Sequence, residues 1–294
     1  MRCITMDSID WEILCELFKY KNITKTSKVL RTSQPAVTYR INKLEEEFNV
    51  KIIHRNKKGV VFTSPGEMLV NYAASMLKKN QQIKEDLLNQ ENKVQGVLRL
   101  SASSIFSRYR LPEILSEFSR QFPLVEFDVN TGWSEEVFRS VHNDTSQVGI
   151  LRGDYSFSSK KIHLMTDKLY VVSKYPIDLE DLPNLPRVYY NTDTSLNRLI
   201  DDWWMGHFIE PSTVTIKVDN METSKQFVLN GLGFTILPDI LLDAHDDLFT
   251  IPCLDHQGHY IIRNTDMILK EQYLNNTVVK AFYNFIKQWN LEHQ

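Results

Sequence analysis

The chain has 294 residues, of which 42% are hydrophobic and 24% charged, and its formal net charge is −3. This composition is typical of a globular protein, and the length exceeds one ordinary core, so we expect two or three folded units. No run of about 18 apolar residues could cross a bilayer, and charges interrupt the apolar positions at the N-terminus, which excludes a secretory signal and predicts a cytoplasmic protein without a membrane partner.

The cysteines and the charge distribution restrict the function classes further. Cys3, Cys15 and Cys253 are odd in number and far apart, which argues against a disulfide framework. Residues 1–66 contain 12 Lys and Arg against 7 Asp and Glu, a balance of +5, whereas the remaining residues carry 22 against 30, a balance of −8. Such an asymmetry is typical of a small unit with a polyanionic partner.

Three short helices are predicted at the N-terminus. The first runs from Ser8 to Tyr20, where apolar residues recur at helical spacing. The second covers Thr24 to Leu30, and after a break at Arg31 and Thr32 the third opens at Ser33, because a proline is tolerated in a first helical turn. The predicted motif is therefore helix, tight turn, helix.

The third helix has two different faces. At about 100° per residue, Val37, Ile41, Leu44 and Phe48 lie together and should pack on the other two helices. The opposite face carries Pro35, Thr38, Tyr39, Asn42 and Lys43. In a helix-turn-helix protein the N-terminal end of this helix meets base edges in the major groove, and the run Glu45–Glu47 at the far end would repel phosphates. The alternative is an ordinary amphipathic helix with a solvated face.

A wing and a long helix should follow. Residues 50–63 are expected to form two short strands around a basic turn that carries Arg55, Lys57 and Lys58 toward a phosphate strand or minor groove. Ser64-Pro-Gly-Glu67 is interpreted as a capping box that starts a helix reaching about Gln90.

The long helix carries a seam of residues spaced four and three apart. Its members are Leu69, Ala73, Met76, Asn80, Ile83 and Leu87. This spacing is typical of a two-helix coiled coil, and the polar Asn80 would favour one register and a dimer. The alternative is that the helix packs on its own domain.

Four motifs connect this part of the chain to a known family. They are Thr26-Ser27-x-x-Leu30, Ser33-Gln34-Pro35-Ala36, Ile41-x-x-Leu44-Glu45, and Arg55 before Thr63-x-x-Gly66. With them, residues 1–90 resemble the N-terminal part of LysR-type transcriptional regulators. Asn49 stands where a glycine is usual and Ile53 where a phenylalanine is usual. The resemblance implies a winged helix-turn-helix that binds double-stranded DNA as a homodimer or homotetramer. It also allows a contact with RNA polymerase.

The expected DNA contacts follow from the exposed face and the wing. Base edges and the backbone beside them should be contacted by Thr32, Ser33, Gln34, Pro35, Thr38, Tyr39 and Lys43. Phosphates should be held mainly by Arg40, Arg55, Lys57 and Lys58.

Beyond a polar hinge at residues 89–95, strands alternate with helices. Strands are expected over 96–103, 125–132, 147–153, 168–174, 213–218 and 234–238, and helices over 110–123, 134–143, 195–208, 221–233 and 276–291. This alternation predicts parallel sheets with ligands at the carboxyl ends of the strands. The predicted fold class is α/β with an N-terminal all-α winged helix-turn-helix and a two-lobed, periplasmic-binding-protein-like effector domain.

The LysR resemblance implies the domain boundaries. The DNA-binding domain would cover residues 1–63, the linker helix and hinge 64–93, and the effector-binding domain 94–294. Lobe one would hold 94–155 plus 265–294, and lobe two 156–264. Gly231-x-Gly233-x-x-x-Leu237-Pro238 and Leu111-Pro112-x-x-Leu115 support this part of the resemblance.

Candidate effector-binding residues lie at strand ends in the second part of the chain. Ser101, Ser103, Ser104 and Ile105 close a strand just before a helix, where hydroxyls and free N–H groups favour an anion, although the serines could equally cap the helix. Arg152 ends another strand, and Arg263 lies in the returning crossover segment. Because a buried guanidinium needs an anion, the pair predicts a small polycarboxylate such as citrate, or else two structural salt bridges with Asp or Glu.

Other function classes find less support in the sequence. It contains no nucleophile elbow, no phosphate-binding loop and no carboxylate pair placed for acid-base work, so we expect no enzyme and no cofactor. Cys253, His256 and His259 have ligand types at metal-like spacing, but strand alternation would not bring all three together, so no metal is expected. The rivals are a small-molecule receptor and a DNA-binding architectural protein with an unliganded cleft.

Overall fold

The structure is a computed structural model that describes residues 6–56, 59–88, 94–243 and 245–293. The chain divides into two compact units, Met1–Glu91 and Asn92–Gln294. Within the described residues, no helix combines the length and the apolar character that a membrane span requires.

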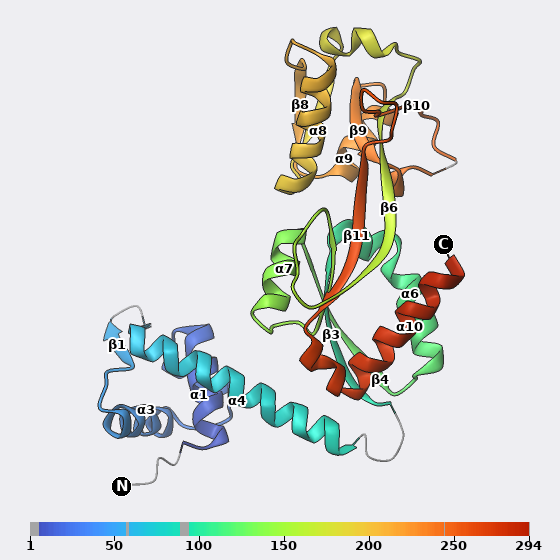
Figure 1. The fold of residues 1–294 in the computed structure, drawn as a ribbon. Helices are drawn as coiled ribbons and strands as arrows, with labels where there is room; N and C mark the ends of the chain where they lie inside the picture. Colours follow the sequence, from blue (N-terminus) through green and yellow to red (C-terminus); the bar gives the residue numbers. More distant parts are fainter. Residues whose placement is uncertain (1–5, 57–58, 89–93, 244, 294) are drawn as a thin grey trace. The chain divides into compact units, whose positions relative to one another are not determined.

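The first unit is a winged helix-turn-helix. It contains α1 (Ser8–Tyr20), α2 (Ile23–Val29), α3 (Gln34–Phe48), the antiparallel hairpin of β1 (Ile53–Asn56) and β2 (Gly59–Phe62), and α4 (Ser64–Leu88) (Figure 1). Its core is built from the apolar faces of the helices and the wing, including Leu14, Leu17, Val37, Ile41, Leu44, Ile52 and Phe62. The core face predicted for the third helix is thus buried, with Phe48 partly so.

The start of α4 differs from the prediction. Thr63, rather than Ser64, caps the helix: its Oγ1 accepts a hydrogen bond from Gly66 N at 3.0 Å. The residue three positions after this cap is a glycine, which has no side chain to complete a capping box. A Cβ at Gly66 would lie 2.2 Å from the carbonyl oxygen of Ile52, so this glycine lets the helix start pass close to the wing.

The second unit is built on one mixed sheet. Its strands follow the order β4-β3-β5-β11-β6-β9-β7-β8, and β10 pairs with β6. Their bounds are β3 (Gly96–Ser103), β4 (Val125–Gly132), β5 (Val148–Arg152), β6 (Lys160–Ser173), β7 (Arg187–Tyr190), β8 (Val214–Val218), β9 (Phe234–Pro238), β10 (Phe249–Pro252) and β11 (Ile262–Leu269). We call the part built on β3, β4 and β5 lobe one, and the part built on β7, β8 and β9 lobe two.

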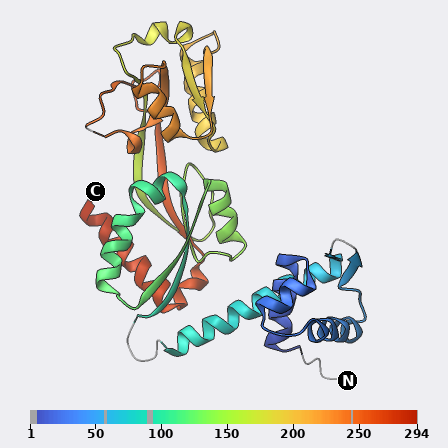
Figure 2. The same ribbon diagram turned by 180° about the vertical axis from the view of Figure 1, so that it is seen from behind.

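Two long strands join the lobes. β6 and β11 run antiparallel side by side from one lobe into the other, as both views show (Figures 1 and 2). The sequence predicted only the second half of β6 and missed β7, β10 and β11 as strands. In the first half of β6, the exposed polar residues Lys161 and His163 alternate with the apolar Ile162 and Leu164, so this half lacks the continuous apolar run by which a buried strand is recognised.

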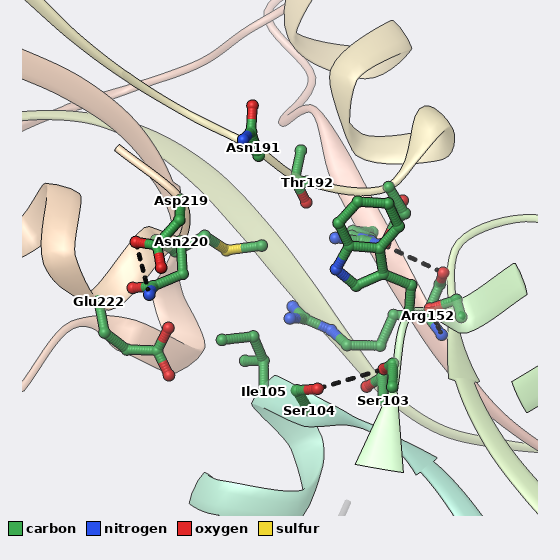
Figure 3. A pocket seen from close by; sticks show the side chains of 15 residues that line it. Ser103, Ser104, Ile105, Arg152, Asn191, Thr192, Asp219, Asn220 and Glu222 are labelled. Carbon is green, nitrogen blue, oxygen red and sulfur yellow. Dashed lines mark hydrogen bonds and ion pairs between the residues drawn. The ribbon is translucent and has the colours of Figure 1, made fainter. Parts of the chain in front are cut away.

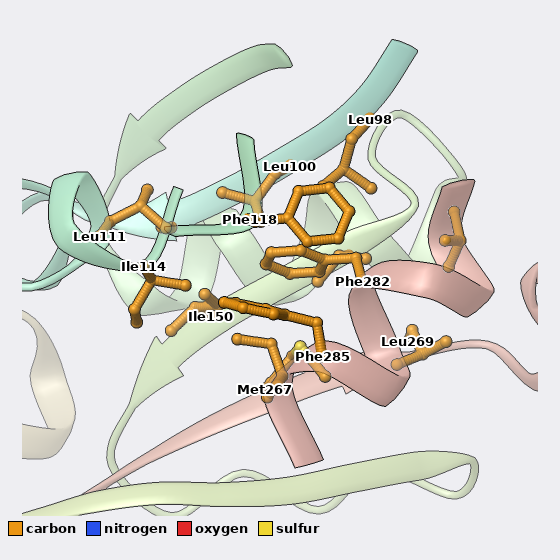
Figure 4. Packing of buried hydrophobic residues seen from close by; sticks show 14 of the residues in the cluster. Leu98, Leu100, Leu111, Ile114, Phe118, Ile150, Met267, Leu269, Phe282 and Phe285 are labelled. Carbon is orange, nitrogen blue, oxygen red and sulfur yellow. The ribbon is translucent and has the colours of Figure 1, made fainter. Parts of the chain in front are cut away.

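Helices cover both faces of lobe one. They are α5 (Ser104–Tyr109), α6 (Leu111–Gln121), α7 (Ser134–His142) and α10 (Thr277–His293). Phe118 of α6 packs edge-on against Phe282 of α10 with ring centroids 5.1 Å apart, over strand residues such as Leu98 and Ile150 (Figure 4). Burying this apolar surface fixes the ends of β3 and β5, which carry the effector-site candidates.

Lobe two has its own core. It contains α8 (Thr194–His207) and α9 (Met221–Leu229). Buried residues of both helices pack with the strands, among them Leu196, Trp203, Trp204, Val228 and Ile236. The helix predicted over 221–233 ends four residues early, because Gly231 and Gly233 take positive φ angles of 79° and 109° that do not continue a helix.

Candidate DNA-binding surface and effector pocket

The helix α3 is shaped by its two ends. Ser33 is its N-cap, and its hydroxyl accepts a hydrogen bond from Ala36 N at 3.2 Å. Asn49 closes the helix in the left-handed region with φ 51°. The LysR resemblance predicts a glycine at this position, which would adopt this conformation without strain. Asparagine is the next most tolerant residue, so Asn49 in place of glycine does not disturb the helix.

The polar face of α3 lies at the surface of the first unit. Gln34, Pro35, Asn42 and Lys43 are exposed, Thr38 is half-buried, and Tyr39 is 68% exposed. Thr32 and Ser33 are exposed in the turn before the helix. The structure therefore brings the predicted base-contacting residues together on one ridge.

Arg40 was predicted to hold a phosphate, but its guanidinium is paired with two carboxylates of its own unit. Its Nη1 lies 2.8 Å from Asp10 Oδ1 and 3.0 Å from both carboxylate oxygens of Asp7. The hydrogen bonds from Arg40 to Asp10 and Asp7 raise the pKa of its guanidinium. Because these carboxylates cap the start of α1, Arg40 ties α3 to α1 and its charge is neutralised inside the unit.

Glu45 also lies differently from the prediction. It was expected in an acidic run facing phosphates, but its carboxylate points inward and accepts hydrogen bonds from Ile52 N at 2.8 Å, Ile53 N at 3.2 Å and Lys51 Nζ at 2.6 Å. Burial raises the pKa of Glu45, yet the bonds from Lys51 and the two backbone N–H groups outweigh it and leave the pKa below its usual value. Glu45 thus fixes the wing to α3.

The wing hairpin approaches the end of α1 closely. Gly59 has φ 135°, and a Cβ there would lie 2.3 Å from the carbonyl oxygen of Lys21, so only glycine fits. Arg55 on β1 is exposed. Lys57 and Lys58, predicted to hold phosphates from the same turn, lie outside the described residues.

The predicted seam of α4 is only partly available to a second chain. Ala73 is fully buried in the core of its own unit, and Leu69 packs against that core. Met76 is half-buried, while Asn80 and Ile83 are exposed; the side chain of Leu87 lies outside the described residues. The alternative, a helix packed on its own domain, therefore holds for the first two turns of the seam.

A stripe of α4 that lies beside the predicted seam and shares Ile83 with it is apolar and exposed. Met68 is 70% and Tyr72 48% exposed, and with Ile83 they lie within about 60° of one another around the helix axis. Together with Phe48 and Val50, the start of this stripe lines an open groove of about 500 Å³. An i, i+4 apolar pair on the exposed side of α4 was the sequence signal for this surface.

A pocket lies between the two lobes of the second unit. It has a volume of about 140 Å³ and is lined by Ser103, Ser104, Ile105, Gly132, Trp133, Ser134, Arg152, Asn191, Thr192, Asp193, Asp219, Asn220, Met221, Glu222 and Arg263. Figure 3 shows Asp219, Asn220 and Glu222 together at one end and Ser103, Ser104 and Arg152 at the other. The volume is below the range of drug-sized pockets, so a ligand here has to be small.

Most of the predicted effector residues line this pocket. Ser101 does not: its hydroxyl is buried against Ser146 Oγ at 2.7 Å. Ser104 Oγ donates to the carbonyl oxygen of Gly132 at 3.3 Å. Ser103 is the N-cap of α5 without a side-chain capping bond, so the capping alternative does not account for its hydroxyl.

Both predicted arginines are paired inside the protein. Arg152 Nη2 lies 2.5 Å from Asp167 Oδ2, and Arg263 Nη2 forms an ion pair with Asp193; the arginine side chains are each 1% exposed. Arg263 also donates to the carbonyl oxygen of Arg152 at 3.2 Å. The alternative of two structural salt bridges is therefore present, so neither guanidinium depends on a ligand for its counter-charge.

Some donors at the pocket nevertheless have no partner. Within the described part of the chain, Ser103 Oγ and the Nε and Nη1 atoms of Arg152 are buried without a hydrogen bond. Burial and the neighbouring Arg263 lower the pKa of the Arg152 guanidinium, as expected for a cation that is incompletely neutralised. Buried donors of this kind call for a ligand or water acceptor.

Sequence reasoning missed the lobe-two side of the pocket. Asn191, Thr192 and Asp193 follow β7, and Asp219 and Asn220 follow β8. Asp193 and Asn220 also cap α8 and α9. Because β8 was predicted, the rule that ligands bind at carboxyl ends of strands could have found Asp219 and Asn220.

A carboxylate near the strands that join the lobes is expected to make stability depend on pH. Burial and Asp167 raise the pKa of Asp239 from 3.8 to about 6, while Lys168 opposes the shift and Tyr170 also faces the group. The folded state therefore binds more protons than the unfolded state between the two values, so this stabilising contribution is complete below pH 3.8 and is lost as pH rises through about 6.

The variant Asp239→Asn, which is neutral at every pH, should melt near the wild-type temperature at pH 4 and above it at pH 7. Thermal unfolding across this range, with the exposed Asp202→Asn as control, measures the difference. A constant difference between Asp239→Asn and wild type would show that Asp239 does not titrate in this window.

Comparisons with known proteins match both units of the chain. Residues 9–67 match the model of bacterial regulatory helix-turn-helix proteins of the lysR family, and residues 91–290 match the LysR substrate binding domain. HTH-type transcriptional regulator YraN of Bacillus subtilis is 40% identical over 96% of this chain and 98% of its own length, and YkuM of the same organism is 32% identical over 94% of each.

Solved structures share the fold. Full-length CbnR in complex with its target DNA superimposes with a TM-score of 0.71 at 15% identity, covering 96% of this chain and 99% of CbnR. A full-length OxyR variant from Pseudomonas aeruginosa gives a TM-score of 0.69 at 18% identity, covering 97% of this chain and 96% of OxyR. The chain belongs to the LysR family of transcriptional regulators, in which a helix-turn-helix DNA-binding domain precedes an effector-binding domain.

Proposed function

We propose that this protein is a cytoplasmic, non-enzymatic regulator that reads duplex DNA with α3, acts as a homodimer or homotetramer, and responds to a small effector bound between its lobes. The DNA-binding part of this proposal rests on the difference between the buried and the exposed face of α3. Val37, Ile41 and Leu44 are fully buried, whereas the ridge from Gln34 to Lys43 carries polar side chains that the unit itself does not cover. Contact with RNA polymerase would be a further step of regulation.

The wing and α3 should contribute differently to the salt dependence of DNA binding. Replacing the exposed Arg55 by Ala should weaken binding to all sequences alike and flatten the slope of log K against log salt by about 0.9, because one phosphate contact is lost. Arg40→Ala should leave the slope unchanged, since Asp7 and Asp10 already hold its charge. Fluorescence anisotropy at several salt concentrations measures both, and circular dichroism checks that each variant is folded. Equal slope changes for Arg55→Ala and Arg40→Ala would contradict these different roles of the two arginines.

The exposed stripe of α4 supports pairing with a second chain. Met68, Tyr72 and Ile83 would be covered by a partner helix, and Phe48 and Val50 extend the groove beside them. Exposed apolar side chains at helical spacing are typical of such interfaces. The proposed dimer surface is therefore rotated from the predicted seam toward the side of Met68 and Tyr72.

The pocket supports effector control. A ligand that accepts hydrogen bonds from Ser103 and Arg152 in lobe one and contacts lobe two binds a closed cleft better than an open one. It can shift the equilibrium only by that difference in affinity. An anionic group on the effector satisfies these donors, and a di- or tricarboxylate such as citrate is the candidate suggested by the sequence. An architectural protein with an unliganded cleft would fill the same donors with water, and no compound would raise its melting temperature.

A further inference from the structure

The charged groups around the effector pocket are almost fully matched within the protein. Arg152 pairs with Asp167 and Arg263 with Asp193, while Glu222 at the other end pairs with Arg108 at 3.0 Å. Counting these groups and Asp219 gives three cations and four anions, a local balance of −1. No cation among them is left over to neutralise several ligand carboxylates.

Asp219 is the unmatched charge. Its carboxylate accepts a hydrogen bond from Asn220 Nδ2 at 3.0 Å, and none of the ion pairs found among the described residues includes it. It is exposed at the rim of the pocket, at the end of β8. An anionic ligand group would be repelled there, whereas an ammonium group would be attracted.

The end of the pocket at Ser103 and Arg152 favours an anionic group instead. Ser103 Oγ and the Arg152 Nε and Nη1 atoms offer hydrogen-bond donors without acceptors, and both side chains are at least nine-tenths buried. One carboxylate accepts bonds from two or three such donors. Figure 3 shows Asp219 and Ser103 on different sides of the same pocket. The pocket is thus polarised, with anion-seeking donors at one end and an unmatched carboxylate at the other.

We infer that the effector is a small zwitterion, such as an amino acid, whose carboxylate is bound at Ser103 and Arg152 and whose ammonium group faces Asp219. This inference rests on the proposed effector-binding function and narrows it. Citrate would place additional negative charge beside Asp219. A simple monocarboxylate would bring no cation to the Asp219 side chain.

The first test compares ligands on the full-length protein. Thermal unfolding is recorded with each of the twenty amino acids, with citrate, succinate and acetate, and with ethylamine. For the amino acid that raises the melting temperature most, calorimetry is repeated with its N-acetyl derivative, which lacks the positive charge, and its amide, which lacks the carboxylate. Each derivative should bind at least about 10-fold more weakly, because one charge-assisted contact is lost in each.

The second test uses matched variants. Asp219→Asn should weaken amino-acid binding by about 5- to 10-fold while leaving the affinity of the N-acetyl derivative unchanged. Asp128→Asn is the control, because Asp128 is also exposed and also accepts a bond from a neighbouring asparagine, Asn130, but lies outside the pocket. Ser103→Ala should weaken every carboxylate ligand without removing either ion pair.

The outcomes separate the two proposals. Stabilisation by an amino acid, with the losses described for both derivatives and for Asp219→Asn, supports the zwitterion. Stronger binding of citrate or succinate than of any amino acid would overturn the zwitterion and leave the effector-binding function intact. If no compound in the panel bound, the zwitterion would be overturned and the effector-binding function would lose its support.

Discussion

Arg263→Ala is expected to lower the free energy of unfolding of the effector-binding unit by about 3–5 kcal/mol, because it leaves the buried carboxylate of Asp193 without its cation. For a unit of this size, the melting temperature should fall by about 10 °C. Arg263 also donates to the carbonyl oxygen of Arg152, so the substitution removes this hydrogen bond to β5 as well. Thermal and urea unfolding monitored by circular dichroism measure the effect.

Two variants show whether the buried pair is the cause. Arg198→Ala removes an arginine that is 82% exposed and 3.6 Å from Asp202 on the same helix, and should cost about 0.5 kcal/mol or less. Arg263→Met with Asp193→Asn removes both charges while the asparagine can still cap α8, and should recover much of the lost stability. Arg263→Ala melting no lower than Arg198→Ala would contradict a structural role for the pair.

Gln34→Ala should relax the base preference of the protein at one position in each half-site by about 1–3 kcal/mol, since glutamine reads adenine through two hydrogen bonds in the major groove. Gln34 is a cleaner test than Ser33, whose hydroxyl caps α3 and whose loss would also destabilise the helix. The measurement is fluorescence anisotropy of a duplex selected from a random library by the wild-type protein, together with its single base-pair variants.

Glu46→Ala provides the control for Gln34→Ala. Glu46 is exposed on the same helix, close to its C-terminal end, and its removal should leave the base preference unchanged. If Gln34→Ala and wild type discriminated equally among all the duplex variants, Gln34 would not contact a base.

Local patterns predicted the elements that build the DNA-binding surface. The spacing of Val37, Ile41 and Leu44 identified the buried face of α3, and the basic turn identified the wing. These features depend on residues a few positions apart, so helical and strand periodicity is enough to find them. The roles of Arg40 and Glu45 could not be found in this way, because their partners, Asp7, Asp10, Ile52 and Ile53, lie on other elements.

The effector pocket was predicted less completely for the same reason. The position of Arg152 at the end of a strand indicated a binding site, but its pairing with Asp167 depends on how β11 pairs with β5 on one side and β6 on the other. Arg263 and Asp193 are 70 residues apart and meet only because β11 passes the start of α8. The matched charges that argue against a polycarboxylate therefore arise from sheet register, which short-range sequence patterns do not encode.

Methylation interference on the selected duplex tests the central claim, that α3 of two paired subunits reads the major groove. Methyl groups at guanine N7 lie in that groove. We expect them to block binding in two short tracts separated by about one helical turn or a multiple of it. Interference by phosphate ethylation alone, with none from N7 methylation, would contradict the assignment of α3 as the reading helix.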